Sequence, residues 1–176
     1  IAESGISVQD LKAIAVSQGP GSYTGLRIGV SAAKGLCFAL NIPLIAIDTL
    51  QTLASKANVL DGKIIPMLDA RRMEVYSEIF NADLEVQRGI QAEIITEESF
   101  AAYTEKLYFV GDCAEKCKLV LTKENFVFLE EIKYPSAREM SKISFDKYQK
   151  SDTVDVAYFE PYYLKDFMMT LPSKKQ

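Results

Sequence analysis

The sequence predicts an α/β fold, and three observations indicate it. The first third of the chain reads as a strand, a glycine-rich turn, a helix and a second strand. From about residue 62 onward, a strand hairpin is followed by alternating helices and strands. The 176 residues are 48% hydrophobic, 25% charged and 10% aromatic, which is typical of one or two globular domains.

The strand–helix–strand unit is read as follows. The apolar run 10–17 ends at Gln18-Gly19-Pro20-Gly21, which predicts a buried strand entering a sharp turn. We expect a helix over 23–40, a second buried strand over 43–47 and a further helix over 49–57. Because a helical crossover normally joins parallel strands in a right-handed sense, this part is expected to be an α/β layer.

The rest of the chain predicts a second set of elements. Strands at 64–69 and 73–80 form a hairpin, which 84–95 extends. The spacing of Ser136 and Glu139 fits a capping box at a helix start. Beyond the hairpin, the expected elements are a helix at 97–103, a strand at 107–110, a helix from 114, a strand at 126–129 and a helix from 136.

These elements divide the chain into two expected units. Residues 1–60 are expected to be the remainder of an N-terminal α/β lobe, and residues 61–176 a C-terminal α/β lobe with a terminal tail. The chain opens with Ile1-Ala2-Glu3-Ser4-Gly5 instead of Met or a basic, apolar leader. We therefore expect that it starts within a longer protein and that the N-terminal lobe is incomplete.

The composition excludes several kinds of chemistry. The chain has no His, so His-activated nucleophiles, the HExxH zinc site and the facial-triad iron site are excluded. The net charge of −4 is not that of a stand-alone nucleic-acid binder. Cys37, Cys113 and Cys117 fit neither a redox pair nor a zinc site and predict reduced thiols in a cytoplasmic protein. The apolar region 28–47 is interrupted by polar residues and Pro, so no membrane segment is expected.

The glycine-rich turn, 19–25, leaves two interpretations open. The turn lies between a strand and a helix, where backbone N–H groups and the helix dipole favour an anion. It matches neither GxxxxGK[ST] nor GxGxxG, and glycines also serve tight turns and close packing. The residues of the candidate anion-binding turn are Gly19, Gly21, Ser22 and Arg27; Arg27 could instead reach an acidic partner residue or lie in solvent.

The helix that follows the turn has two apolar faces. Among residues 25–40 only Arg27, Ser31 and Lys34 are strongly polar. The two apolar rows at helical spacing are Gly25, Gly29 and Ala33, and Ile28, Ala32, Leu36 and Ala39. One face can cover a sheet, and the other needs a cover from this chain or from a separate chain.

The run Ile14-Ala-Val-Ser-Gln-Gly-Pro-Gly-Ser-Tyr-Thr-Gly-Leu-Arg-Ile-Gly29 closely resembles the signature of the bacterial TsaB (YeaZ) family. The resemblance continues through Ala33–Leu36, Pro43–Leu50 and 67–76 to the closing 161–165, so it spans essentially the whole chain. It implies the actin-like, sugar-kinase and heat-shock ATPase fold, which is ribonuclease H-like, with two related lobes. It also implies a role in forming threonylcarbamoyladenosine at position 37 of tRNA.

The resemblance further implies that the chain is a scaffold whose partners are a TsaD-like paralogue and a TsaE-like ATPase. ATP and a metal are expected on the TsaD-like partner, tRNA contact is expected through the complex, and the isolated chain could pair with itself. The family pairs through helices of the N-terminal lobe, which selects the first helix here. The expected partner interface is Gly25, Leu26, Gly29, Val30 and Ala33.

No residue is predicted to be catalytic or to bind a metal. The resemblance implies that the paralogue carries Pro-Leu followed by His-x-x-x-His, whose two His side chains bind a metal. The corresponding positions here are Thr49 and Leu53, which cannot supply these two ligands. Gly111-Asp112 resembles the glycine pair that lies beside the adenosine in the paralogue, but Asp112 replaces the second glycine, and its carboxylate would repel a nucleotide. Asp69 and Arg71 could form a polar site between the lobes, but Asp69 is rather expected to stabilise a turn, with Arg71 solvated or paired. The alternatives are a self-sufficient ATPase or kinase that uses the glycine-rich turn and, last, a peptidase.

Overall fold

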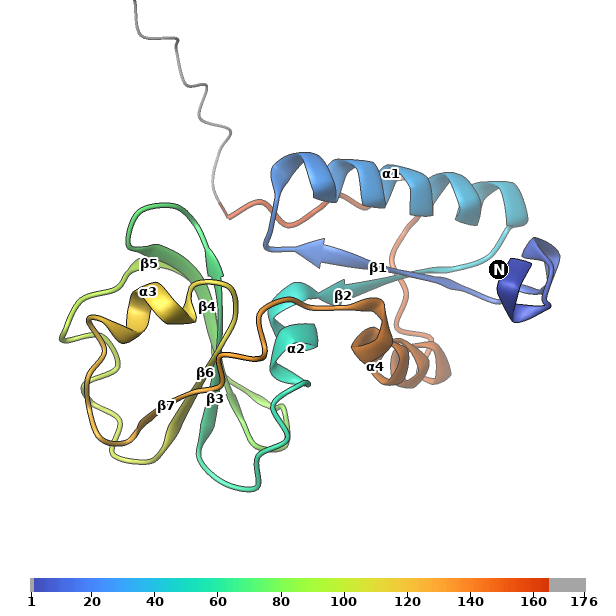
Figure 1. Cartoon of the computed structure of the whole chain (residues 1–176). Helices are drawn as coiled ribbons and strands as arrows, with labels where there is room; N and C mark the ends of the chain where they lie inside the picture. The colour runs from blue at the N-terminus through green and yellow to red at the C-terminus, as the bar shows by residue number, and fades with distance from the viewer. Residues whose placement is uncertain (1, 165–176) are drawn as a thin grey trace, which may run out of the picture.

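The strand–helix–strand unit forms as predicted in the computed structural model, which describes residues 2–164 (Figure 1). After two short 3-10 turns, the elements are β1 (Ile14–Gly19), α1 (Tyr23–Leu40) and β2 (Leu44–Asp48). β1 and β2 pair in parallel. The Ser22 hydroxyl accepts a hydrogen bond from the Gly25 amide and caps α1, and Asn41, in the left-handed conformation at φ 53°, ends it.

The second sheet has five strands in the order β5-β4-β3-β6-β7. Their bounds are β3 (Lys63–Asp69), β4 (Glu74–Asn81), β5 (Val86–Ile94), β6 (Leu107–Val110) and β7 (Phe126–Phe128). The predicted hairpin is the antiparallel pair of β3 and β4, with Leu68 opposite Tyr76, and β5 extends it. β6 and β7 continue the sheet in parallel from the other edge of β3.

A helix covers each face of the five-stranded sheet. α2 (Thr49–Ala54) packs Leu50 and Leu53 against Ile64 and Phe80. α3 (Ala114–Lys118) contributes to the core on the opposite face. Because α2 directly follows β2, it also lies between the two sheets, as Figure 1 shows.

The helix predicted at 97–103 is wrong. The segment forms successive turns, in which the Tyr103 amide donates to the Phe100 carbonyl at 3.2 Å. Phe100 has a positive φ of 59°, which is incompatible with a continuous right-handed helix. Its ring is buried, with its centroid 5.5 Å from that of Phe109, so burial of one aromatic side chain outweighs local helix preference.

The end of the described chain returns to the first sheet. α4 (Ala137–Gln149) packs on β2, and Val154 then forms an antiparallel bridge with Leu44. Within the described chain, residues 137–164 therefore lie with elements of the first 60 residues. The predicted capping box is also wrong in detail: the Ser136 hydroxyl donates to the Glu139 carboxylate and makes no cap to the helix backbone.

Candidate functional site

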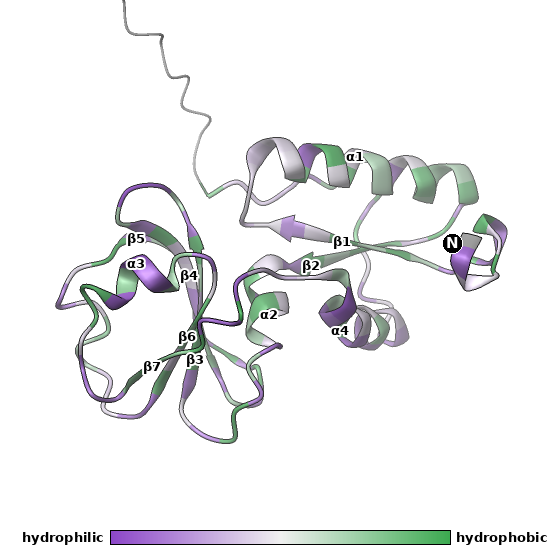
Figure 2. Cartoon of the chain, viewed as in Figure 1, coloured by the Kyte–Doolittle hydropathy of each residue, from purple (hydrophilic) through white to green (hydrophobic). Residues whose placement is uncertain are grey.

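Helix α1 has one face buried by its own chain and one face exposed. Val30 and Ala33 are only 3% and 5% exposed, and Cys37 is buried beside them. The exposed row runs through Ile28, Ala32, Leu36 and Ala39, which we call the outer face of α1. Ile28 is 67% exposed, so this face presents apolar surface to solvent. Figure 2 shows hydrophobic residues recurring along the ribbon of α1. No helix within residues 2–164 is long and apolar enough to cross a membrane.

The structure distributes the predicted interface residues over both faces. Gly25 is exposed and Leu26 is half-buried. Gly29 lies over β1, because an added Cβ would meet Val16 Cγ2 at 3.9 Å. Val30 and Ala33 are enclosed by this chain, which leaves their side chains almost no surface for a partner. The row that the sequence assigned to a partner is therefore largely the row that meets the sheet.

The glycine-rich turn has a packing role at its first residue. Gly19 is buried at φ +113°, and a Cβ there would lie 2.8 Å from the Tyr162 carbonyl oxygen. The Tyr162 amide donates to the Gln18 carbonyl at 2.7 Å, so the returning chain is fixed against the end of β1. Gly21 has open space around it, and the Ser22 hydroxyl serves the helix cap. Anion binding by this turn stays a prediction.

Arg27 lies beside an aromatic pair at the start of α1. Its Nη1 donates to the Tyr23 hydroxyl at 3.2 Å, and its guanidinium carbon is 5.2 Å from the centroid of that ring. The Tyr23 and Tyr163 ring centroids are 4.9 Å apart. With Lys34 and Glu160, these three residues line a groove of about 350 Å³ between α1 and the returning chain.

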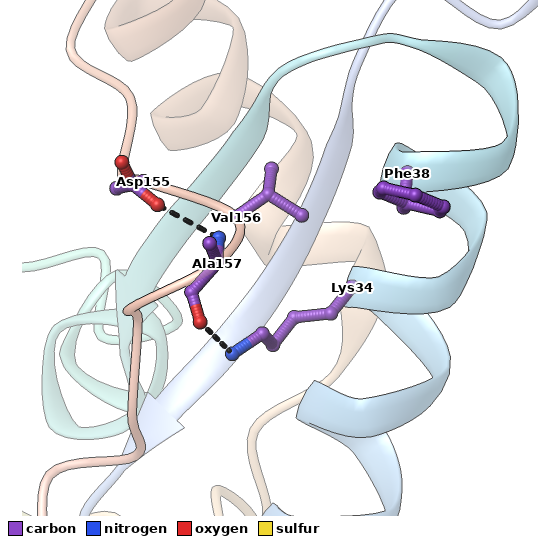
Figure 3. Close-up of a pocket in the computed structure, with 5 residues that line it drawn as sticks. All are labelled: Lys34, Phe38, Asp155, Val156 and Ala157. Carbon is purple, nitrogen blue, oxygen red and sulfur yellow. Dashed lines mark hydrogen bonds between the residues drawn. The ribbon is translucent and has the colours of Figure 1, made fainter.

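Lys34 fastens the returning chain to α1. Its Nζ donates to the carbonyls of Ala157 at 3.1 Å and Phe159 at 2.9 Å. Figure 3 shows this side chain reaching across from α1, with Phe38 further along the same helix and Asp155 capping the turn that contains Ala157. These residues line a second pocket, of about 520 Å³, which is mainly apolar.

Two acidic residues lie near the junction of the two sheets, Asp48 at the start of α2 and Glu78 on β4, which α2 contacts, and sequence reasoning missed both. Asp48 ends β2 and caps α2 by accepting from the Leu50 and Gln51 amides at 2.7 and 2.9 Å. Burial raises the pKa of Asp48 to about 6 against these hydrogen bonds. Glu78 is 6% exposed on β4, and burial, reinforced by the Asp48 charge and opposed by Arg88, raises its pKa to about 8. The sequence did carry a signal for Glu78. Alternate residues of a strand share a face, so Glu78 lies on the same face as Tyr76 and Phe80 and is expected to be buried with them.

The positions compared with a metal and nucleotide site have structural roles here. The Thr49 hydroxyl shares a hydrogen bond with the Ser17 hydroxyl, and Leu53 is fully buried. Asp112 accepts a hydrogen bond from the Asp69 amide at 2.9 Å. Within residues 2–164, no three His, Cys, Asp or Glu side chains are grouped to hold a metal ion.

Asp69 stabilises the turn after β3, as predicted. It accepts a hydrogen bond from the Arg71 amide at 2.9 Å and pairs with the Lys116 ammonium. Partial burial acts to raise the pKa of Asp69, but the bonds from Lys116 and Arg71 outweigh it, and the pKa is lowered.

Comparison with known families gives one consistent match. Residues 1–167 match the family model described as TsaD, tRNA N6-adenosine threonylcarbamoyltransferase. The Escherichia coli tRNA threonylcarbamoyladenosine biosynthesis protein TsaB is 31% identical over 93% of this chain and 74% of its own length. The Bacillus subtilis protein of the same name is 42% identical over 52% of this chain and 38% of its own length.

Solved structures show the same fold. The Pseudomonas aeruginosa protein YeaZ superposes with a TM-score of 0.76 and 24% identity, over 93% of this chain and 79% of that one. An uncharacterized protein described by its similarity to peptidase YEAZ from the same organism superposes with a TM-score of 0.77. The predicted actin-like α/β fold is confirmed.

Proposed function

The chain belongs to the TsaB (YeaZ) family, and from this premise we propose that it is a non-catalytic scaffold in the formation of N6-threonylcarbamoyladenosine at position 37 of tRNA. Its relatives are named for the biosynthesis of this nucleoside. The proposed partners are a TsaD-like transferase, which carries ATP and metal, and a TsaE-like ATPase. tRNA contact would come through the complex, which implies a cytoplasmic location.

The exposed outer face of α1 carries the proposal. An apolar row of a well-formed helix that residues 2–164 leave in solvent is typical of a protein interface. The small side chains of Ala32 and Ala39 let a partner helix approach closely, while Ile28 and Leu36 supply apolar area. α1 carries Arg27 and Lys34 and no acidic residue, so a partner helix with a carboxylate near Arg27 suits it best.

The residues at the compared catalytic positions support a scaffold role. Leu53 is buried and cannot ligate a metal, and Thr49 is engaged with Ser17. Asp112 is engaged with the backbone at the end of β3. These side chains hold the fold together, and the proposal places transfer chemistry on the partner.

The decisive experiment measures binding of the TsaD-like paralogue to an Ile28→Asp variant. A charge at Ile28, which is 67% exposed on the outer face, should weaken binding by about 2 kcal/mol, roughly 30-fold. Ile94→Asp is the matched control, because Ile94 is 68% exposed on β5, away from α1. Gly29 is unsuitable for this purpose, since it faces Val16 of the same chain. Equal binding by both variants, each folded by circular dichroism, would exclude the outer face of α1 as the interface.

Two further measurements separate this function from its alternatives. Loss of the modified adenosine from the tRNA of cells depleted of this protein tests the pathway. ATP turnover by the purified chain alone tests the ATPase alternative, which uses the glycine-rich turn. Sustained turnover without a partner would contradict the scaffold role. Sedimentation of the isolated chain tests self-pairing, which Ile28→Asp should abolish if two copies use the same face.

A further inference from the structure

The Glu78 carboxyl group lies in the interior without a full set of partners. Glu78 is on β4, between the α2-covered side chains of Tyr76 and Phe80, and is 94% buried. Within the part of the chain that the structure describes, its Oε2 atom is buried and accepts no hydrogen bond. An ionised carboxylate in this position would have a buried oxygen with neither solvent nor a donor, which is strongly unfavourable.

The neighbouring charges do not relieve this cost. Arg88 on β5 is the cation whose field acts on Glu78, but its Nη2 donates to Glu93 at 2.5 Å and to Ser77 at 2.6 Å. Its Nη atoms are therefore paired with another carboxylate, while its buried Nε makes no hydrogen bond among the described residues. Asp48, at the junction of β2 and α2, is the other charged group that acts on Glu78, and it is negative. Two carboxyl groups from different sheets thus oppose each other.

We propose that Glu78 and Asp48 form a proton-operated latch between the two sheets, in which a proton held on Glu78 keeps α2 seated on β4. The neutral acid removes the repulsion across the junction and the cost of the unpartnered oxygen. Loss of this proton leaves two negative charges at the junction, one of them at the cap of α2, and loosens the contact. The latch is a property of this chain alone and does not depend on the proposed function.

The raised pKa of Glu78 determines how the seating of α2 depends on pH. Burial raises the pKa of Glu78 to about 8, above the ordinary value of 4.5. An acid whose folded pKa is raised contributes its full stabilisation below the unfolded value and loses it as pH rises through the folded value. The equilibrium constant for opening α2 should therefore rise by up to about tenfold per pH unit between pH 5 and 8.

Two measurements on the whole chain test the latch. Infrared difference spectra should show a protonated carboxylic acid at pH 7 that disappears in Glu78→Gln and persists in Glu98→Gln, a matched control on an exposed Glu. Hydrogen-exchange protection factors of α2 amides such as Ser55, which donates to Gln51, should fall at least tenfold from pH 6 to 8 in the wild type. In Glu78→Gln they should stay within about twofold.

The outcomes are distinct. An ionised Glu78 at pH 7, or a carboxylate band that shifts when magnesium is added, would overturn the latch, since the site would then hold a cation and not a proton. Equal loss of protection in the wild type and in Glu78→Gln would also overturn it. A second variant keeps the infrared test valid if Glu78→Gln folds poorly. Asp48→Asn keeps an acceptor for the cap of α2 and removes the negative charge that raises the pKa of Glu78. The acid band should therefore disappear at a lower pH in this variant than in the wild type.

Discussion

At the residue scale, backbone approach decides which glycines are needed. Gly111, after β6, has a φ of +127°, and a Cβ there would overlap the carbonyl oxygen of Met67 on β3. Its amide donates to the Ile132 carbonyl at 2.8 Å. In the sequence, Gly111 stands out only through its resemblance to a nucleotide-binding glycine. The structure gives it a packing role.

Gly111→Ala should therefore destabilise the chain by more than about 2 kcal/mol, because it adds both backbone strain and a steric overlap. Gly35→Ala is the matched control. Gly35 lies exposed within α1 with no atom near its added Cβ, so alanine should stabilise the helix by about 0.5–1 kcal/mol. Urea unfolding of both variants measures the difference, and a Gly111→Ala variant as stable as the wild type would refute the packing role.

At the element scale, one lysine helps to hold the returning chain against α1. Lys34 is one of only two charged residues of α1, and both of its bonds go to carbonyls more than 120 residues away. In the sequence, Lys34 is only one of three strongly polar residues among 25–40. In the structure, it joins α1 to the segment 155–163.

Lys34→Met keeps the apolar stem and removes both hydrogen bonds. Protection of the Tyr162 amide, which donates to the Gln18 carbonyl, should fall by about tenfold, while the core strands stay unchanged. Lys142→Met is the control, since Lys142 forms only an exposed pair with Asp146. A similar loss in both variants, measured by hydrogen exchange, would show that Lys34 does not fasten this segment.

At the scale of the whole molecule, the two sheets are joined by α2 and by the return of α4 to β2. α2 shares a core with the five-stranded sheet, while its cap, Asp48, belongs to the two-stranded sheet. Charge at this junction is therefore coupled to the stability of the whole chain.

Global stability should decline from pH 5 to pH 8. Because the pKa of Asp48 is raised to about 6, the free energy of unfolding should fall as pH rises to about 6. Because the pKa of Glu78 is raised to about 8, this fall should continue to about pH 8. Each group contributes a slope of at most about 1.4 kcal/mol per pH unit in its window. The double variant Asp48→Asn/Glu78→Gln should flatten the dependence of the urea-unfolding free energy on pH. Parallel curves for the two proteins would rule out this origin of the pH dependence.

The sequence predicted most elements because their signals are local. The glycine-rich turn and Asn41 bound α1, and the alternation in β4 indicates the hairpin. The helix expected at 97–103 failed because Phe100 is held by the distant Phe109, which no local pattern reveals. The roles of Lys34 and Glu78 were missed for the same reason, since each depends on residues far along the chain.

The sequence by itself determined the α/β class, the bounds of α1, the family and the presence of two apolar faces on α1. Only the tertiary structure decided which face meets the sheet, where 137–164 packs and which carboxyl groups have a raised pKa. Periodicity records that a face is apolar, whereas burial depends on where other elements lie. The pKa of Glu78 likewise depends on the surroundings that long-range packing creates.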